Sequence, residues 1–196
     1  MNKKNCAIFI SGRGSNLESL IKESKNENFP IQINLIISDN INAAGLKFSE
    51  THNIDSYSID YTSFVNKDKF EQNLLNELKD KNIELICLAG FMRILSSEFI
   101  NSFTGPILNI HPSLLPKYKG LNTHQRVLDN NDKITGCTVH FVSEELDSGE
   151  IILQKSLYID ENETAETLMN RVLKLEHQAY PEAINGYSPR RKFLLH

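Results

Sequence analysis

The sequence predicts an α/β protein with a mostly parallel sheet and helices on both faces of that sheet. Five apolar, strand-like runs are separated by helical patterns, and they occupy residues 6–11, 31–38, 56–59, 83–89 and 106–111. Strands that alternate with helices favour a parallel sheet, which makes the N-terminal half Rossmann-like. After residue 120 two strand-like runs follow each other without a long helix between them. They predict an antiparallel addition near the C-terminus.

The clearest single helix lies over residues 66–81. Phe70, Leu74 and Leu78 recur there at fourfold spacing, which places them on one helical face. In the second half, a short helix is expected over 123–130 and a long one over 164–185. The two late strands are expected at 136–142 and 150–159, joined by "SEELDSG", and the last ten residues show no pattern.

Length and composition fit one soluble domain that spans residues 1–196. Charged residues make up 23% of the chain and hydrophobic residues 40%. A net charge of −4 gives no basic field that would favour nucleic acid. No apolar run approaches the ~20 residues that cross a bilayer, and "MNKKNCAIFI" is too short in its apolar part for a secretory signal. We therefore expect no nucleic-acid or membrane partner.

The three cysteines are predicted to be reduced residues of the core. Cys6, Cys87 and Cys137 are far apart in the sequence, and each has apolar neighbours. Their spacing matches neither a disulfide framework nor a zinc set. Reduced cysteines indicate a cytoplasmic location.

Polar residues follow three of the predicted strands. They are Ser11-Gly12-Arg13-Gly14-Ser15-Asn16, Gly90-Phe91-Met92-Arg93 and Asn109-Ile110-His111. Open α/β sheets bind ligands outside the carboxyl ends of their strands. The three stretches are therefore expected to share one site.

The glycine-rich turn after the first strand is a candidate phosphate site. Gly12 and Gly14 allow a tight turn, and amides at the start of the next helix can hold an anion. A nucleotidase-type loop would need Gly-Lys-Ser/Thr, which is missing. A dinucleotide fingerprint would need a small residue in place of Leu17, with Asp39 as its acid. A monophosphate suits the turn better, and a plain strand-to-helix turn is the structural alternative.

Asn109, His111 and Asp147 form a candidate catalytic trio. Residues two apart in a strand point to the same face, so Asn109 and His111 project side by side. An amide can donate to a developing oxyanion, and an imidazole can donate or move a proton near neutral pH. A carboxylate beside the imidazole would keep it charged and position a water. Taken singly, each residue has a simpler interpretation, as a hydrogen-bonded strand end or a turn residue.

The chemistry that the trio suggests is direct transfer to a carbonyl-type centre. No Ser or Cys lies in a nucleophile elbow, and no histidine pair has metal-ligand spacing on a helix. We therefore expect neither a covalent intermediate nor a metal.

Glu176 interrupts the apolar arc of the long helix. At roughly 100° per residue, one face is expected to contain Leu168, Met169, Val172, Leu173, Leu175, Ala179, Tyr180 and Ala183. Glu176 falls near the middle of that face, where an unpaired carboxylate is costly. It requires a buried cation, backbone donors or a substrate as its partner, and a structural ion pair remains an equal alternative.

Four stretches resemble a known family. "SGRGSNL", "LAGFMRIL", "LNIHPSLLPKYKGL" and "HFVSEELDSGEIILQ" are similar to the phosphoribosylglycinamide formyltransferase family, the purine-biosynthesis branch of the folate-dependent formyltransferases. The resemblance covers nearly the whole chain. It implies 10-formyltetrahydrofolate as the formyl donor and co-substrate, the amine of glycinamide ribonucleotide as acceptor, and no metal.

The resemblance also implies roles for individual residues. Residues 1–100 would form the half that binds the ribonucleotide phosphate, and 101–196 the folate and catalytic half. Asn109, His111 and Asp147 would be catalytic. The ribonucleotide would contact Gly14, Ser15, Asn16 and Glu176. The folate would contact Lys67, Met92, Arg93, Ile94, Leu95, Asn109, Val142, Ser143, Glu144, Glu145, Leu146 and Asp147. Both substrates are anionic, so cations near these loops would compensate, namely Arg13, Lys67, Arg93, Lys117, Lys119 and Arg126.

Three other functions compete with this interpretation. A formyltetrahydrofolate hydrolase could use the same trio, but it is expected to carry an extra segment ahead of the first strand. A methionyl-tRNA formyltransferase is expected to need a further C-terminal domain and a basic surface. A noncatalytic nucleotide-binding module would need only the glycine turn and would leave the trio unexplained. We expect an enzyme that is a monomer or a weak homodimer.

Overall fold

The computed structural model describes residues 3–186 and contains one seven-stranded sheet. The strand order is β3-β2-β1-β4-β5-β6-β7. The strands are β1 (Lys4–Ile10), β2 (Ile31–Ser38), β3 (Asp55–Ser58), β4 (Leu85–Leu88), β5 (Ile107–His111), β6 (Ile134–Phe141) and β7 (Ile151–Tyr158). All pairings from β3 to β5 are parallel, and β6 and β7 are antiparallel to their neighbours. The predicted fold class is therefore confirmed.

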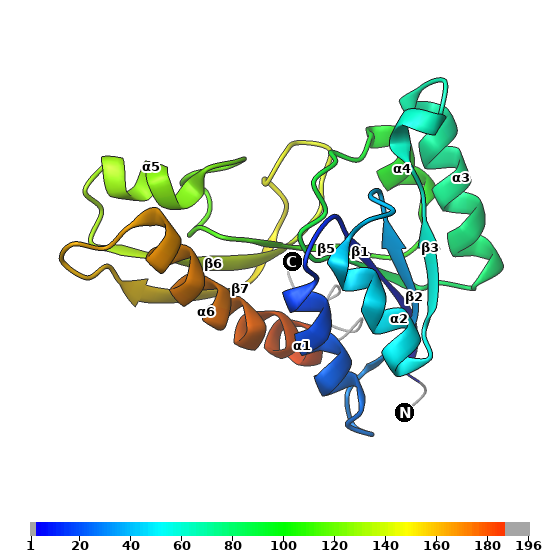
Figure 1. Cartoon of the computed structure of the whole chain (residues 1–196), viewed down its shortest axis with the longest axis horizontal. Helices are drawn as coiled ribbons and strands as arrows, with labels where there is room; N and C mark the ends of the chain where they lie inside the picture. Colours follow the sequence, from blue (N-terminus) through cyan, green and yellow to red (C-terminus); the bar gives the residue numbers. More distant parts are fainter. Residues whose placement is uncertain (1–2, 187–196) are drawn as a thin grey trace, which may run out of the picture.

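Helices cover both faces of the sheet (Figure 1). One face packs against α1 (Ser15–Ser24), α2 (Lys47–His52), α5 (Thr123–Asp129) and α6 (Ala165–Gly186). The other face packs against α3 (Lys67–Asp80) and α4 (Ser97–Ser102). Two short 3-10 turns, η1 (Ala44–Leu46) and η2 (Tyr61–Ser63), complete the described elements.

Strand β1 shows why the sheet is buried on both sides. Cys6 and Ile8 belong to the core under α1 and α6, whereas Ala7 and Phe9 belong to the core under α3 and α4. Each of these residues is fully buried, so β1 is apolar from Cys6 to Ile10 and does not alternate with polar residues there. The three apolar residues predicted on α3 do face its core.

Helix α6 runs back along the sheet to α1, so the end of the described chain lies against its beginning (Figure 1). Leu168, Val172 and Tyr180 are fully buried, as the apolar arc predicted. Met169, Leu173 and Leu175 are only partly buried, because they lie at the edge of the contact face. The Tyr180 hydroxyl donates to the carbonyls of Leu88 and Leu108, which ties α6 to β4 and β5.

The three cysteines are buried thiols without a disulfide. Cys6 and Cys87 are nevertheless close neighbours across β1 and β4, with their sulfur atoms 3.8 Å apart. In the described part of the chain, no helix is long and apolar enough to cross a membrane. The patternless C-terminal residues 187–196 lie outside the described residues.

Candidate active site

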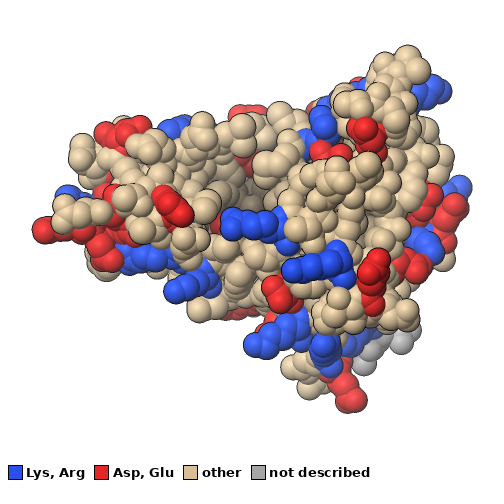
Figure 2. All heavy atoms as spheres, in the orientation of Figure 1, with Lys and Arg blue, Asp and Glu red and all other residues tan. Residues whose placement is uncertain are grey.

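A cavity of about 500 Å³ opens beside the carboxyl ends of β4 and β5. Its walls come from the loops after these strands, from the segment around Asp147, and from α1, α5 and α6. In the space-filling view a hollow lies near the centre of one face, with Lys and Arg side chains beside it (Figure 2). The site therefore lies where an open α/β sheet places its ligands.

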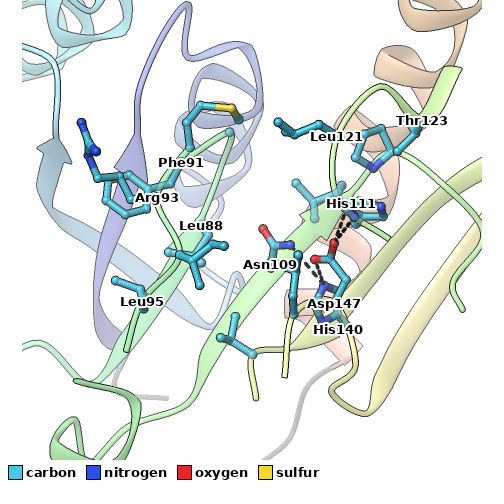
Figure 3. Close-up of a pocket in the computed structure, with 18 of the residues that line it drawn as sticks. Leu88, Phe91, Arg93, Leu95, Asn109, His111, Leu121, Thr123, His140 and Asp147 are labelled. Carbon is cyan, nitrogen blue, oxygen red and sulfur yellow. Dashed lines mark hydrogen bonds and ion pairs between the residues drawn. The ribbon is translucent and has the colours of Figure 1, made fainter. Parts of the chain in front are cut away.

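The trio converges on this cavity (Figure 3). His111 Nδ1 lies 3.4 Å from Asp147 Oδ2, and both side chains are less than one-tenth exposed. Asp147 has a φ of 48°, a left-handed backbone conformation that Asp tolerates better than most residues. Asn109 and His111 from β5 and Asp147 from a distant turn thus line the same cavity.

The fourth member of this group is His140 on β6. Its Nδ1 lies 2.8 Å from the Phe141 carbonyl oxygen, so Nδ1 must carry the hydrogen. Its Nε2 lies 3.1 Å from Asn109 Nδ2. Burial lowers the pKa of His140 and outweighs the nearby Asp147 carboxylate, which raises it. The neutral Nε2 therefore accepts from the Asn109 amide and leaves the second Nδ2–H for a substrate oxygen.

The other reactive groups are oriented by backbone atoms. His111 Nε2 donates to the Tyr118 carbonyl oxygen at 2.9 Å, which leaves Nδ1 as the nitrogen facing Asp147 and the cavity. Asp147 Oδ2 accepts from the Gly120 amide at 2.8 Å. The 3.4 Å between Nδ1 and Oδ2 is longer than a normal hydrogen bond, so a substrate atom or a water can approach Nδ1.

The glycine turn leads directly into α1. Gly14 has a φ of 74°, and a Cβ there would lie 2.9 Å from the Gly45 backbone. Only glycine meets both conditions without strain. Gly12 differs from the expectation, because a Cβ there would meet nothing within 4 Å. Its carbonyl instead accepts from the Gly45 amide at 3.0 Å.

Glu176 has the partner that its burial requires. Asn16 Nδ2 donates to Glu176 Oε2 at 2.7 Å, and each residue is only 7% exposed. Burial raises the pKa of Glu176 to about 7, while the Asn16 bond opposes that shift. Asn16 Oδ1 is buried without a hydrogen-bond partner. The pair lines the cavity and offers two polar atoms to a ligand.

The raised pKa of Glu176 predicts a dependence of stability on pH. The folded chain keeps a proton that the unfolded chain releases above its ordinary value of 4.5. The folded state therefore binds more protons up to about pH 7, and the free energy of unfolding falls as pH rises through that window. We expect a loss of about 3 kcal/mol for this group.

Denaturant unfolding from pH 4 to pH 8 measures this loss. The wild type and Glu176→Gln share all other titrating groups, so the difference between their curves isolates Glu176. Wild type should lose stability relative to the variant as pH rises. Parallel curves would contradict the assignment.

The structure places most predicted binding residues in the cavity lining. These are Asn16, Met92, Arg93, Ile94, Leu95, Asn109, Val142, Ser143, Glu144, Leu146, Asp147 and Glu176. Gly14, Ser15, Lys67 and Glu145 lie outside that lining.

Most of the compensating cations are engaged by the protein itself. Arg93 lies 2.9 Å from Asp39 and stacks 3.9 Å above the Tyr61 ring, and its guanidinium points away from the trio (Figure 3). Lys67 lies 3.7 Å from Glu71, and Lys119 lies 3.3 Å from Glu145. Arg13 is exposed beside the glycine turn. The described cavity therefore offers fewer uncommitted cations than the sequence suggested.

Sequence reasoning missed His140 and left His124 without a role. Both line the cavity, and burial lowers the pKa of His124. His140 stands opposite Asn109 in the antiparallel pairing of β5 with β6. The register of β5 with β6 is the feature that would have indicated His140 as a site residue. Among the described residues, no cluster of three His, Cys, Asp or Glu could hold a metal ion.

The chain belongs to the formyl transferase family, whose model matches residues 4–184. Individual relatives indicate which member of this family the chain resembles. The chain is 39% identical over 181 residues to phosphoribosylglycinamide formyltransferase of Bacillus subtilis, covering 92% of this chain and 93% of that protein. The family resemblance seen in the sequence is confirmed.

Two further relatives agree. The crystal structure of phosphoribosylglycinamide formyltransferase from Brucella melitensis superposes with a TM-score of 0.90 at 44% identity, covering 94% of this chain and 95% of that one. The chain is also 44% identical over 183 residues to the trifunctional purine biosynthetic protein adenosine-3 of Gallus gallus. The match covers 93% of this chain but only 18% of that longer protein.

Proposed function

We propose that the chain transfers a formyl group from 10-formyltetrahydrofolate to the amine of glycinamide ribonucleotide, in purine biosynthesis. The carrying observation is the convergence of Asn109, His111 and Asp147 on one cavity in a member of the formyl transferase family. An amide, an imidazole and a carboxylate can assist amine attack on a formyl carbon, by stabilising the oxyanion and by moving a proton.

The acceptor side of the proposed site lies at α1 and α6. Gly14, Ser15 and Asn16 open α1, where backbone amides favour a phosphate. Arg13 is exposed beside this turn and adds a positive charge. Glu176 and Asn16 would bind ribose hydroxyls or the amine, because both are buried and aimed at the cavity. Residues 1–100 would thus contribute the phosphate-binding half.

The donor side would lie between the 92–95 segment and the 142–147 segment. Met92, Ile94 and Leu146 are apolar and well exposed at the cavity, which suits the flat ring of a pterin. Lys67 and Glu145 would act only at the far end of the folate, since both lie outside the cavity lining. Residues 101–196 would contribute the catalytic half.

In the proposed mechanism the acceptor amine attacks the formyl carbon and a tetrahedral oxyanion forms. Asn109 donates its second Nδ2–H to that oxygen, and protonated His111 donates through Nδ1. The carbon–nitrogen bond to the folate then breaks. Asp147, through a water, carries a proton from the new ammonium toward the folate nitrogen that leaves. Charge balance is kept because the amine loses the proton that the leaving nitrogen gains.

The decisive assay supplies 10-formyltetrahydrofolate with and without glycinamide ribonucleotide, and follows loss of the formyl group. Loss that depends on the ribonucleotide is expected. Loss without it would indicate a hydrolase, and no loss would leave a binding module. The proposal includes a cytoplasmic enzyme, monomeric or weakly dimeric, with small-molecule substrates and no nucleic-acid or membrane partner. The net charge of −4 and the three buried thiols support this part.

A further inference from the structure

The 118–121 loop, between β5 and α5, supplies backbone groups to two members of the trio. The Tyr118 carbonyl accepts from His111 Nε2 at 2.9 Å. The Gly120 amide donates to Asp147 Oδ2 at 2.8 Å. The direction of the imidazole and of the carboxylate therefore depends on where this loop lies.

Local preference does not account for the conformation of Tyr118, although Gly120 and Asn122 tolerate a positive φ. Tyr118 has a φ of 58° and Gly120 a φ of 77°, and Asn122 follows at 56°. The left-handed region is costly for tyrosine, by about 1 to 3 kcal/mol. Such a conformation persists only when contacts from outside the loop maintain it.

Arg126 on α5 provides such contacts. Its Nη1 donates to the Lys119 carbonyl at 2.6 Å and reaches the Leu121 carbonyl at 3.3 Å. These two carbonyls flank Gly120. The guanidinium carbon also lies 5.3 Å from the centre of the Tyr118 ring. One half-buried side chain thus contacts the loop at three residues, Tyr118, Lys119 and Leu121.

Asp132, in the turn after α5, holds the outer edge of the same loop. Its Oδ2 accepts from the Tyr118 hydroxyl at 2.9 Å and pairs with Lys117 Nζ at 3.1 Å. Neither Arg126 nor Asp132 lines the cavity. The hydrogen bonds of these residues therefore reach the trio only through the loop.

We propose that Arg126 is a positioning residue for the transfer reaction. It fixes the 118–121 loop so that the Tyr118 carbonyl directs His111 Nδ1 to the cavity and the Gly120 amide aims the Asp147 carboxylate. The proposal rests on the proposed function for its chemistry. Its structural half, the coupling of Arg126 to Gly120 and His111, can be measured without substrate.

The test compares Arg126→Met, Arg126→Lys and a matched control, Arg171→Met. Arg171 also donates to a backbone carbonyl, that of Tyr158 at 3.0 Å, and pairs with Asp160, but its partners lie away from the cavity. Three quantities are measured for each protein. They are amide hydrogen exchange at Gly120, the ring-nitrogen resonances of His111, and the steady-state kcat and KM with both substrates.

In Arg126→Met we expect faster exchange at Gly120, shifted His111 resonances and a fall in kcat of about ten- to a hundredfold, with KM changed less. Arg126→Lys can reach one carbonyl and should be intermediate. Arg171→Met should match the wild type in all three. If Arg126→Met fails to fold, Arg126→Lys carries the same comparison.

Two results would overturn the proposal. Unchanged exchange at Gly120 would show that Arg126 does not hold the loop. Faster exchange with an unchanged kcat would show that the loop does not position the reacting groups. If the wild type transferred no formyl group, the proposed function would fall by itself. In that case, unchanged His111 resonances in Arg126→Met would also reject the positioning role of Arg126. Shifted His111 resonances would support its coupling to the 118–121 loop.

Discussion

Replacing Asn109 with alanine should lower kcat for formyl transfer by about 10² to 10³, which corresponds to about 3 to 4 kcal/mol of lost transition-state stabilisation. The Asn109 amide is oriented by His140, so its second N–H remains available to the proposed oxyanion. A donor held in place costs no reorganisation during the reaction, and its loss is felt mainly in kcat. Steady-state kinetics with saturating ribonucleotide and formyl folate measures the effect.

Asn73→Ala is the matched control for this variant. Asn73 also uses its side-chain amide in a partly buried hydrogen bond, in which its Oδ1 accepts from the Tyr57 hydroxyl at 2.5 Å. It lies on α3, outside the cavity lining. Its kcat should equal that of the wild type. A loss below about tenfold in Asn109→Ala would be too small for an oxyanion donor and would remove that role.

Asp147→Asn should lower kcat by about 10² to 10⁴, the usual contribution of general acid–base catalysis. The asparagine oxygen can still accept from the Gly120 amide, so the loop contact seen at 2.8 Å is retained. The substitution removes the carboxylate beside His111, which is the group proposed to move the proton. The KM values for both substrates should therefore change little.

A surface pair provides the comparison for Asp147. Asp55 pairs with Lys81 at the far edge of the sheet, and Asp55→Asn removes a carboxylate without touching the cavity. It should leave kcat and KM unchanged. A rise in KM without a fall in kcat for Asp147→Asn would make Asp147 a binding residue.

The strands and the long helices were predictable because their patterns are strong. The apolar runs of β1 and β4 are buried on both faces, and Phe70, Leu74 and Leu78 give α3 a clear period. Helices α2 and α4 were not singled out. Each has six residues, fewer than two turns, and buries too few side chains to set a period.

The candidate site was only partly predictable, since its geometry depends on pairings that the sequence does not state. Alternation along β5 placed Asn109 and His111 on one side. The position of His140 opposite Asn109 follows from the antiparallel register of β5 with β6. The hydrogen bond between Asn16 and Glu176 needs the return of α6 to α1. Burial could demand a partner for Glu176, but it could not identify that partner.

The contact between Asn16 and Glu176 also bears on how the chain matures during its synthesis. The two residues are separated by 160 positions, so a ribosome adding about 5 to 20 residues per second needs roughly 10 to 30 s to make the second after the first. Until α6 emerges, the cavity wall that contains Glu176 is incomplete. The residues up to α6 must therefore be synthesised before a ligand of this cavity can stabilise the nascent chain through Glu176.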